Sequence, residues 1–133
     1  MKQAIIMITL ILLLAGCNLG TSDVTAVPTP DLPSVEILSP ANNQQVIIGV
    51  DFNFDIVARD STAGIALVEL YVDDALINFS TPVDAASVPI FRTEMNWQAS
   101  GIGRHIIAVI AYREDGTPSD PARLTIEVLE REG

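Results

Sequence analysis

The sequence has a single cysteine, Cys17, among its 133 residues. One thiol can neither close an intrachain disulfide nor supply the several sulfur ligands of a cysteine-based zinc site. A globular domain in this chain must therefore rest on its own apolar core. An apolar content of 49% makes such a core feasible.

Basic residues are also scarce, with 7 lysines and arginines against 17 acidic residues and a net charge of −10. The only lysine is Lys2, so removal of an amino-terminal segment would leave six arginines and a net charge of −11. Such a chain repels phosphate backbones, which argues against a nucleic-acid partner. It also offers no polybasic attraction to anionic lipids, so any attachment to a membrane must be hydrophobic or covalent.

Signatures of catalysis are missing as well. The sequence has no glycine-rich phosphate loop, no serine elbow and no cluster of nitrogen and sulfur metal ligands. Its one histidine, His105, alternates in phase with Ile107 and Val109, so we expect it at the edge of the core rather than in a catalytic triad. We therefore predict a protein that is not an enzyme and holds no cofactor. A hydrolase with paired carboxylates is the remote alternative.

The first residues resemble a bacterial export signal. A short positive start is followed by Ala4–Ala15, which is apolar except for Thr9. This run is too short to span a bilayer, which needs roughly 20 residues, but it suits the core of a signal peptide. An ordinary secretory signal or an uncleaved anchor is the alternative interpretation.

The apolar run ends in Leu14-Ala15-Gly16-Cys17, which resembles the lipobox of bacterial lipoproteins. The resemblance implies a signal peptide over residues 1–16 and a diacylglyceryl group on the Cys17 thiol. After cleavage the new amino terminus can be acylated again, and two or three acyl chains give stable anchoring. The protein would then sit in the cell envelope, with its domain on the extracytoplasmic side of a bacterial membrane.

Residues 17–34 follow as a predicted tether. This segment is small and polar, contains Pro28, Pro30 and Pro33, and has neither a helical nor a strand period. We expect an extended linker reaching roughly 50 Å at about 3 Å per residue. An ordered extra strand is the less favoured alternative, because proline is disfavoured inside strands.

Residues 35–130 show short alternating segments separated by turns, with no amphipathic helix. In the second segment Val50, Phe52, Phe54, Ile56 and Ala58 share one face, and a kink is expected at Gly49. About seven strands are predicted: Val35–Leu38, Val46–Ala58, Ile65–Val72, Leu76–Phe79, Ile90–Trp97, Arg104–Tyr112 and Arg123–Leu129. This count and spacing indicate an all-β protein with an immunoglobulin-like sandwich of antiparallel strands.

The same region resembles bacterial Ig-like domains of cell-surface proteins, with fibronectin type III domains as the near alternative. The resemblance is carried by VEILSPAN at 35–42, by GI at 64–65 with VELYVDD at 68–74, and by Trp97 before GRH at 103–105. It is also carried by residues 108–111 and by Asp115-Gly116. Asp74-Ala75 replaces the usual Asp-Gly of the turn. The resemblance implies adhesion, spacing or ligand binding, a buried Trp97, and no shared catalytic residues.

Two groups of side chains remain as candidate sites. Loops expected at one pole of the sandwich carry Asp60, Asp115 and Asp120, with Asp84 and Glu114 nearby. Carboxylates are calcium ligands, but these lack a fixed ligand spacing, so solvated loop charge is the favoured explanation. The second group is an apolar row on the outer side of neighbouring strands, formed by Leu67, Tyr71, Ile106, Ile110, Tyr112 and Leu129. An exposed apolar patch of this size suggests a partner surface, unless the linker, another strand or a second copy covers it.

The sequence thus favours a membrane-anchored, non-catalytic module that binds a protein or glycan partner. A structural spacer or accessory subunit of an envelope complex is the alternative. In an Ig sandwich the amino terminus emerges at the pole with the acidic loops, so we expect that pole to face the membrane.

Overall fold

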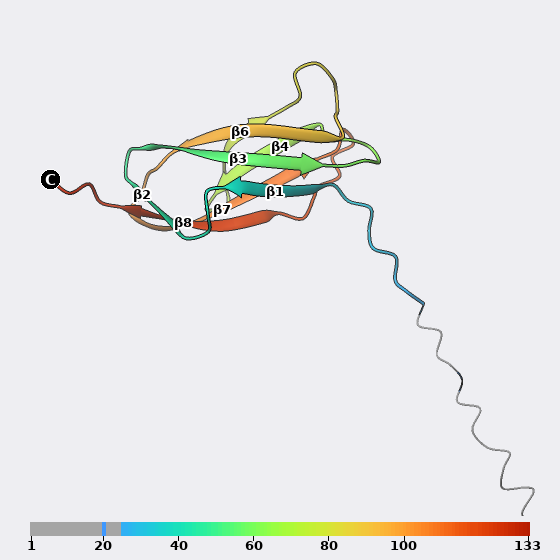
Figure 1. Cartoon of the computed structure of the whole chain (residues 1–133), viewed down its shortest axis with the longest axis horizontal. Helices are drawn as coiled ribbons and strands as arrows, with labels where there is room; N and C mark the ends of the chain where they lie inside the picture. Colours follow the sequence, from blue (N-terminus) through green and yellow to red (C-terminus); the bar gives the residue numbers. More distant parts are fainter. Residues whose placement is uncertain (1–19, 21–24) are drawn as a thin grey trace, which may run out of the picture.

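The computed structural model describes residue 20 and residues 25–133, and its regular structure consists of eight β-strands. The strands are β1 (Ser34–Ser39), β2 (Gln44–Ile47), β3 (Asp51–Arg59), β4 (Leu67–Val72), β5 (Ala75–Ser80), β6 (Ile90–Gln98), β7 (Gly103–Tyr112) and β8 (Ala122–Leu129). They form two facing sheets, which confirms the predicted all-β sandwich (Figure 1).

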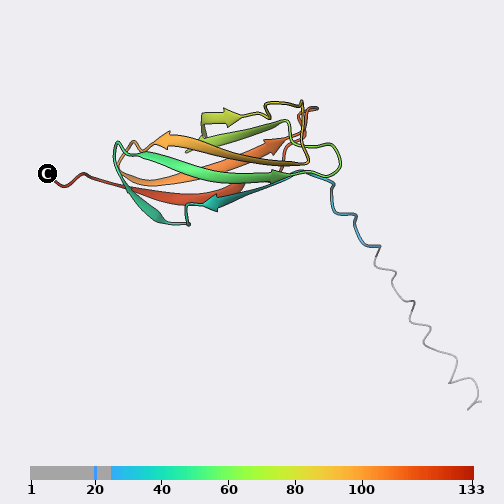
Figure 2. The same ribbon diagram turned by 45° about the horizontal axis from the view of Figure 1, so that its top comes forward.

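The smaller sheet has the order β1-β3-β6, and the larger has the order β2-β8-β7-β4-β5. All neighbours are antiparallel except β2 and β8, which run parallel. The predicted adjacency of the third strand, the long apolar strand and the last strand is confirmed, because β4, β7 and β8 are neighbours. Figure 2 shows the two layers from a second direction.

The predicted count of seven strands is one too low, because the second apolar segment divides between the two sheets. Gly49 has a φ of +83°, a left-handed conformation that glycine adopts without a Cβ clash. Residues before this kink join β8, whereas residues after it join β1 and β6. Val50, predicted to face the core, lies at the kink and is 42% exposed.

The core lies between the sheets and follows the alternation of each strand. Phe54, Ile56 and Ala58 of β3 are fully buried, as are Val68 and Leu70 of β4, while Phe52 packs against the edge of this cluster. Trp97 is 5% exposed, which confirms its predicted burial.

The turn between β4 and β5 has the mirror-image backbone conformation of an ordinary type I turn, which matches the right-handed twist of the two strands it joins. Asp73 and Asp74 have φ values of 49° and 67°, and Val72 pairs with Ala75 across them. Two central residues with positive φ define a type I′ turn. Aspartate is tolerated at both central positions, although glycine is the commoner residue at the second one. The predicted tight turn therefore forms without the glycine that is usual at this position in the domains the sequence resembles.

The two ends of the sandwich differ in what they carry. The chain enters β1 at the end that holds the 60–66, 81–89 and 113–121 loops, which we call the tether pole (Figure 1). The carboxyl terminus leaves at the opposite end, the far pole, together with the β4–β5 and β6–β7 turns. The fold thus agrees with the expectation that the chain enters beside the acidic loops. No helix in the described residues is long and apolar enough to cross a membrane.

Candidate functional site

The outer side of the five-stranded sheet carries a continuous row of apolar and aromatic side chains. Alternation on β4 and β7 buries Val68, Leu70, Ile107 and Val109 completely and turns the residues between them outward. The register then aligns these outward residues across β5, β4 and β7. We call this surface the apolar face; it consists of Leu67, Tyr71, Leu76, Phe79, Ile106, Ile110 and Tyr112.

Three of these side chains are strongly exposed: Phe79 at 63%, Ile106 at 56% and Leu76 at 51%. The other four are half-buried by their neighbours on the sheet. In the described residues, this face is not covered by another strand or by the chain that precedes β1. The predicted positions of Leu67, Tyr71, Ile106, Ile110 and Tyr112 therefore gather on one face.

Sequence reasoning missed Leu76 and Phe79 of β5. Both side chains face outward, because Leu76 pairs with Tyr71 and Phe79 pairs with Glu69. Leu76 and Phe79 are three positions apart, whereas residues on the same side of a regular strand are separated by an even number of positions. Both can face outward because the β4–β5 pair contains a register shift, a β-bulge, between Leu70 and Tyr71. Only the bulge brings both onto the apolar face.

Leu129 does not belong to this continuous patch, contrary to the prediction. On β8 and β7, Glu127 and Arg104 pair across the register and separate Leu129 from Ile106. Leu129 instead pairs with Ile47 of β2 near the far pole. The predicted partner face is therefore divided by a charged pair.

Glu69 is the one acidic side chain inside the apolar face. It lies on β4 between Phe79 on one side and Ile110 on the other. The Tyr71 hydroxyl donates a 2.5 Å hydrogen bond to Oε2 of Glu69. The Glu69 carboxylate, followed by the Tyr112 hydroxyl, raises the pKa of Tyr71 well above its usual value, since ionised tyrosine beside a carboxylate is disfavoured.

A buried ion pair organises the tether pole. Asp60 is 5% exposed, and its carboxylate accepts hydrogen bonds from Nε and Nη2 of Arg113 at 2.5 and 3.2 Å. The Arg113 guanidinium, helped by the backbone amides of Thr62 and Ala63, holds the pKa of Asp60 below its usual value against the opposing effect of burial. Asp60 is thereby fixed as an anion that locks the 60–66 loop to the loop after β7.

The end of the predicted tether is ordered against this pair. Asp31 accepts a hydrogen bond from Thr62 Oγ1 at 3.2 Å and forms an ion pair with Arg113 Nη2 at 3.1 Å. Pro33 is buried, and Ser34 already belongs to β1. Ordered contacts thus begin a few residues before the predicted start of the domain.

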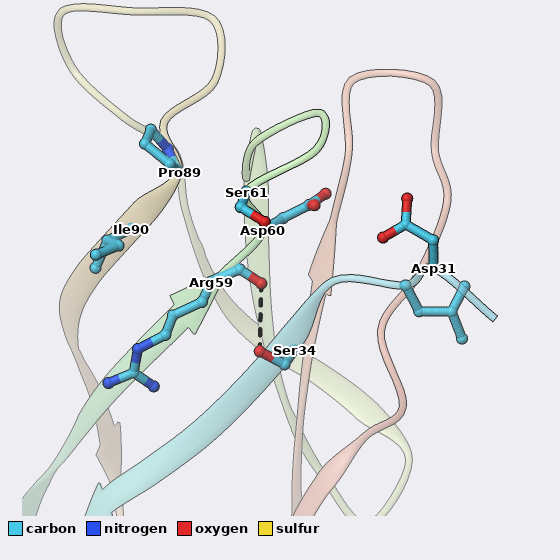
Figure 3. A pocket seen from close by; sticks show the side chains of 8 residues that line it. Asp31, Ser34, Arg59, Asp60, Ser61, Pro89 and Ile90 are labelled. Atoms are coloured by element: carbon cyan, nitrogen blue, oxygen red, sulfur yellow. Dashed lines mark hydrogen bonds between the residues drawn. The ribbon is translucent and has the colours of Figure 1, made fainter. Parts of the chain in front are cut away.

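A shallow cleft of about 430 Å³ opens beside this ion pair. Figure 3 shows Ser34 and Arg59 among the residues that line it, with Ser34 Oγ donating a 3.3 Å hydrogen bond to the Arg59 carbonyl. Its lining residues are Asp31, Leu32, Ser34, Arg59, Asp60, Ser61, Pro89 and Ile90. The buried carboxylate of the cleft is already neutralised by Arg113, so the cleft holds no uncompensated buried charge.

The three calcium candidates are not brought together. Asp60 is paired with Arg113, Asp115 accepts a hydrogen bond from the Thr117 amide at 2.9 Å, and Asp120 is exposed. That backbone hydrogen bond is the main reason that the pKa of Asp115 is lowered. Within residues 20 and 25–133, no group of three or more histidine, cysteine, aspartate or glutamate side chains could hold a metal ion.

His105 joins the two turns of the far pole. Its Nδ1 lies 2.6 Å from Asp73 Oδ2, and its Nε2 lies 2.5 Å from the Gly101 carbonyl oxygen. Both partners are acceptors, so only the doubly protonated imidazolium satisfies both. Burial alone would lower the pKa of His105, but these two acceptors outweigh it and raise the pKa. The ring also packs edge-on against Trp97, which agrees with a structural place at the core edge.

Cys17 and the motif residues Leu14, Ala15 and Gly16 lie outside the described residues, so the lipidation motif stays a prediction from sequence.

Comparison with known proteins agrees with this architecture. A family model described as bacterial Ig domain matches residues 33–109, which is more than half of the chain. No curated protein matches the sequence.

Among solved structures, the chain is similar to fibronectin(III)-like modules of Clostridium thermocellum CbhA. The identity is 27% and the TM-score 0.59, over 74% of this chain and 100% of that one. It is also similar to the SrpA adhesin of Streptococcus sanguinis, with 14% identity and a TM-score of 0.54 over 77% of this chain and 59% of that chain. A third similar structure is the sialic acid binding region of a Streptococcus sanguinis SK1 adhesin bound to 3'sLn. There the identity is 17% and the TM-score 0.50, over 75% of this chain and 30% of that chain.

Proposed function

We propose that this chain, which belongs to the bacterial Ig domain family, is a lipid-anchored binding protein of the bacterial cell envelope. In this proposal Cys17 carries the lipid, and the apolar face binds a protein partner on the extracytoplasmic side. The domain acts by binding and not by catalysis, with no cofactor other than the covalent lipid.

The proposed anchor is supported by the sequence, and the place where the chain enters the fold bears on how the anchored domain would be oriented. The Leu14-Ala15-Gly16-Cys17 motif ends an apolar run of signal-peptide length. The chain from Cys17 reaches the sandwich at the tether pole, where Asp31 contacts Arg113. In the proposed arrangement the far pole would face away from the bilayer, and the apolar face would be accessible along the side of the domain.

Exposure of Phe79, Ile106 and Leu76 is the observation that carries the binding role. Water contact with clustered apolar side chains is unfavourable, and such patches in natural proteins mark interaction surfaces. A domain that served only as a spacer would have no use for this surface, and the exposed apolar side chains would lower its solubility.

The test of the face is a charged substitution with a matched control. In native membranes, Ile106→Glu should abolish crosslinking of a partner to a photoreactive residue placed at Leu76, while leaving thermal unfolding unchanged. Ile90→Glu is the control, because Ile90 is exposed to a similar extent, 60% against 56% for Ile106, but lies on the other sheet. Equal crosslinking in the wild type and in Ile106→Glu would refute binding through this face, and a glycan-array signal lost in Ile106→Glu would replace the protein partner by a glycan.

The anchor has a separate test. The intact mass of the mature protein should include a diacylglyceryl group, and globomycin should cause the unprocessed precursor to accumulate. Cys17→Ala should prevent both lipid addition and processing. A mature wild-type protein without added lipid mass would refute the anchor and would leave the binding face untouched.

A further inference from the structure

We infer that the apolar face recognises a protein that inserts an arginine or lysine side chain between apolar residues, and that Glu69 receives this cation. The inference rests on the proposed binding role of the face and adds the chemistry of its partner.

Glu69 has no cation beside it on the sheet. Its neighbours across the register are Phe79 on β5 and Ile110 on β7, and its neighbours along β4 on the same side are Leu67 and Tyr71. Within the described part of the chain, Glu69 takes part in no ion pair. The donors beside it are neutral hydroxyls: Tyr71 donates a hydrogen bond to it, and the hydroxyl of Tyr112, whose pKa is raised by burial and by the Glu69 carboxylate, also lies beside it.

The other glutamate on the outer side of this sheet has a different environment. Glu127 lies across the register from Arg104 and accepts a hydrogen bond from Gln45 Nε2 at 3.2 Å. Glu127 thus has an arginine directly opposite it on its own sheet, whereas the donors beside Glu69 are neutral hydroxyls, although a carboxylate can accept several hydrogen bonds.

The lack of a cation beside Glu69 becomes important when a partner binds. A partner that covers Phe79 and Ile110 also covers the carboxylate between them, and removing a carboxylate from water is strongly unfavourable unless it gains a charged, hydrogen-bonded partner. A purely apolar partner would be rejected by Glu69, whereas one that supplies a guanidinium or ammonium group would be selected.

The charge of the whole domain favours the same class of partner. Residues 25–133 contain six arginines and sixteen carboxylates, so the field around the domain attracts cations and speeds their encounter. A protein fits this face better than a glycan. The exposed positions of the apolar face include the aliphatic side chains of Ile106 and Leu76, which suit apolar side chains of a protein. The hydroxyl of Tyr71 already donates its hydrogen bond to Glu69.

The experiment uses the mature lipidated chain in nanodiscs and a phage-displayed library of random twelve-residue peptides, with empty nanodiscs for counter-selection. Selected peptides should contain an arginine or lysine flanked by apolar residues, and Ile106→Glu should abolish their binding. Glu69→Gln keeps the shape and an acceptor for Tyr71, and it should weaken binding by about thirty-fold or more, the loss expected when one partner of a buried charge pair is removed. Exchange of the peptide cation for glutamine should cause a similar loss, and the two losses should not add.

Glu94→Gln is the matched control, because it removes one negative charge from the outer side of the opposite sheet. Glu94→Gln should change the affinity of the peptides less than about two-fold, because physiological salt screens an exposed charge on the opposite side of the sandwich. Peptides that need Ile106 but bind Glu69→Gln as tightly as wild type would overturn the role of Glu69 and leave the face intact. Peptides that ignore Ile106→Glu would overturn the proposed face itself.

Discussion

The buried carboxylate of the tether pole gives a sharp prediction about stability. Asp60→Asn keeps the size of the side chain and an oxygen that can accept from the Thr62 and Ala63 amides, which lie 3.1 and 3.4 Å from the present carboxylate. The new amide group, however, would face the guanidinium of Arg113. An amide nitrogen at the Oδ2 position would meet Arg113 Nε donor to donor, whereas the oxygen at the Oδ1 position could still accept from Nη2.

The size of the loss follows from burial. Removing one partner of a fully buried ion pair costs about 3–5 kcal/mol. Asp31 remains within 3.1 Å of Arg113 but is 62% exposed, so it compensates only weakly, and we expect a loss near the lower bound, about 3 kcal/mol. For a domain of about 100 residues this lowers Tm by roughly 12–24 °C.

Urea unfolding of the wild type, Asp60→Asn and Asp31→Asn at pH 7 is the assay. Asp31→Asn removes a carboxylate from the same guanidinium at an exposed position, so it should cost at most about 1 kcal/mol. Equal, small losses in both variants would refute the argument that burial decides the strength of the pair.

The pH dependence gives a second check on the same pair. The pKa of Asp60 is lowered in the fold, so its contribution is present above the unfolded value and is lost as the pH falls through the folded value. The difference between wild type and Asp60→Asn should therefore be constant from pH 5 to 7 and should shrink below pH 3.8, the usual pKa of an aspartate.

Three further predictions concern the far pole and the core. The pKa of His105 is raised and that of Asp73 is lowered. Their bond therefore stabilises the fold fully between pH 3.8 and pH 6.5, the usual pKa values of aspartate and histidine, and this stabilisation fades as the pH rises through the folded pKa of His105. Urea unfolding at pH 5.5 and 9 should show His105→Gln losing less stability at the higher pH. Gly101→Ala should cost about 1–2 kcal/mol, because Gly101 has a φ of +74° and an added Cβ would lie 3.1 Å from His105 Cε1; an unchanged Tm would contradict this. Phe54→Ala should cost about 3–5 kcal/mol by calorimetry, since Phe54 is fully buried and packs edge-on against Phe52.

The number of strands shows where the sequence pattern was insufficient. Alternation through Phe54, Ile56 and Ala58 predicts a half-buried strand, and the structure confirms it. The same alternation cannot show that the chain changes sheets at Gly49, because a strand has the same period of two in either sheet. Val50 consequently keeps its phase in the sequence but lies at the crossing and is exposed.

The apolar face was predictable wherever it depends on a single regular strand. Ile106, Ile110 and Tyr112 alternate on β7, so their shared side follows from the sequence. Leu76 and Phe79 needed the bulge in the β4–β5 pair, and the exclusion of Leu129 needed the register of Arg104 with Glu127. Register and bulges depend on contacts between strands, which a single sequence does not specify.

The sequence by itself determined the fold class, the lack of a disulfide and the predicted role of Cys17, because these depend on composition, local period and one short motif. The tertiary structure decided which charges are compensated. Asp60 and Glu69 are both acidic residues beside apolar segments, yet only Asp60 is paired with an arginine, Arg113, which lies 53 positions later in the sequence. Charge compensation depends on distance in space, and among the described residues the fold places no arginine in an ion pair with Glu69.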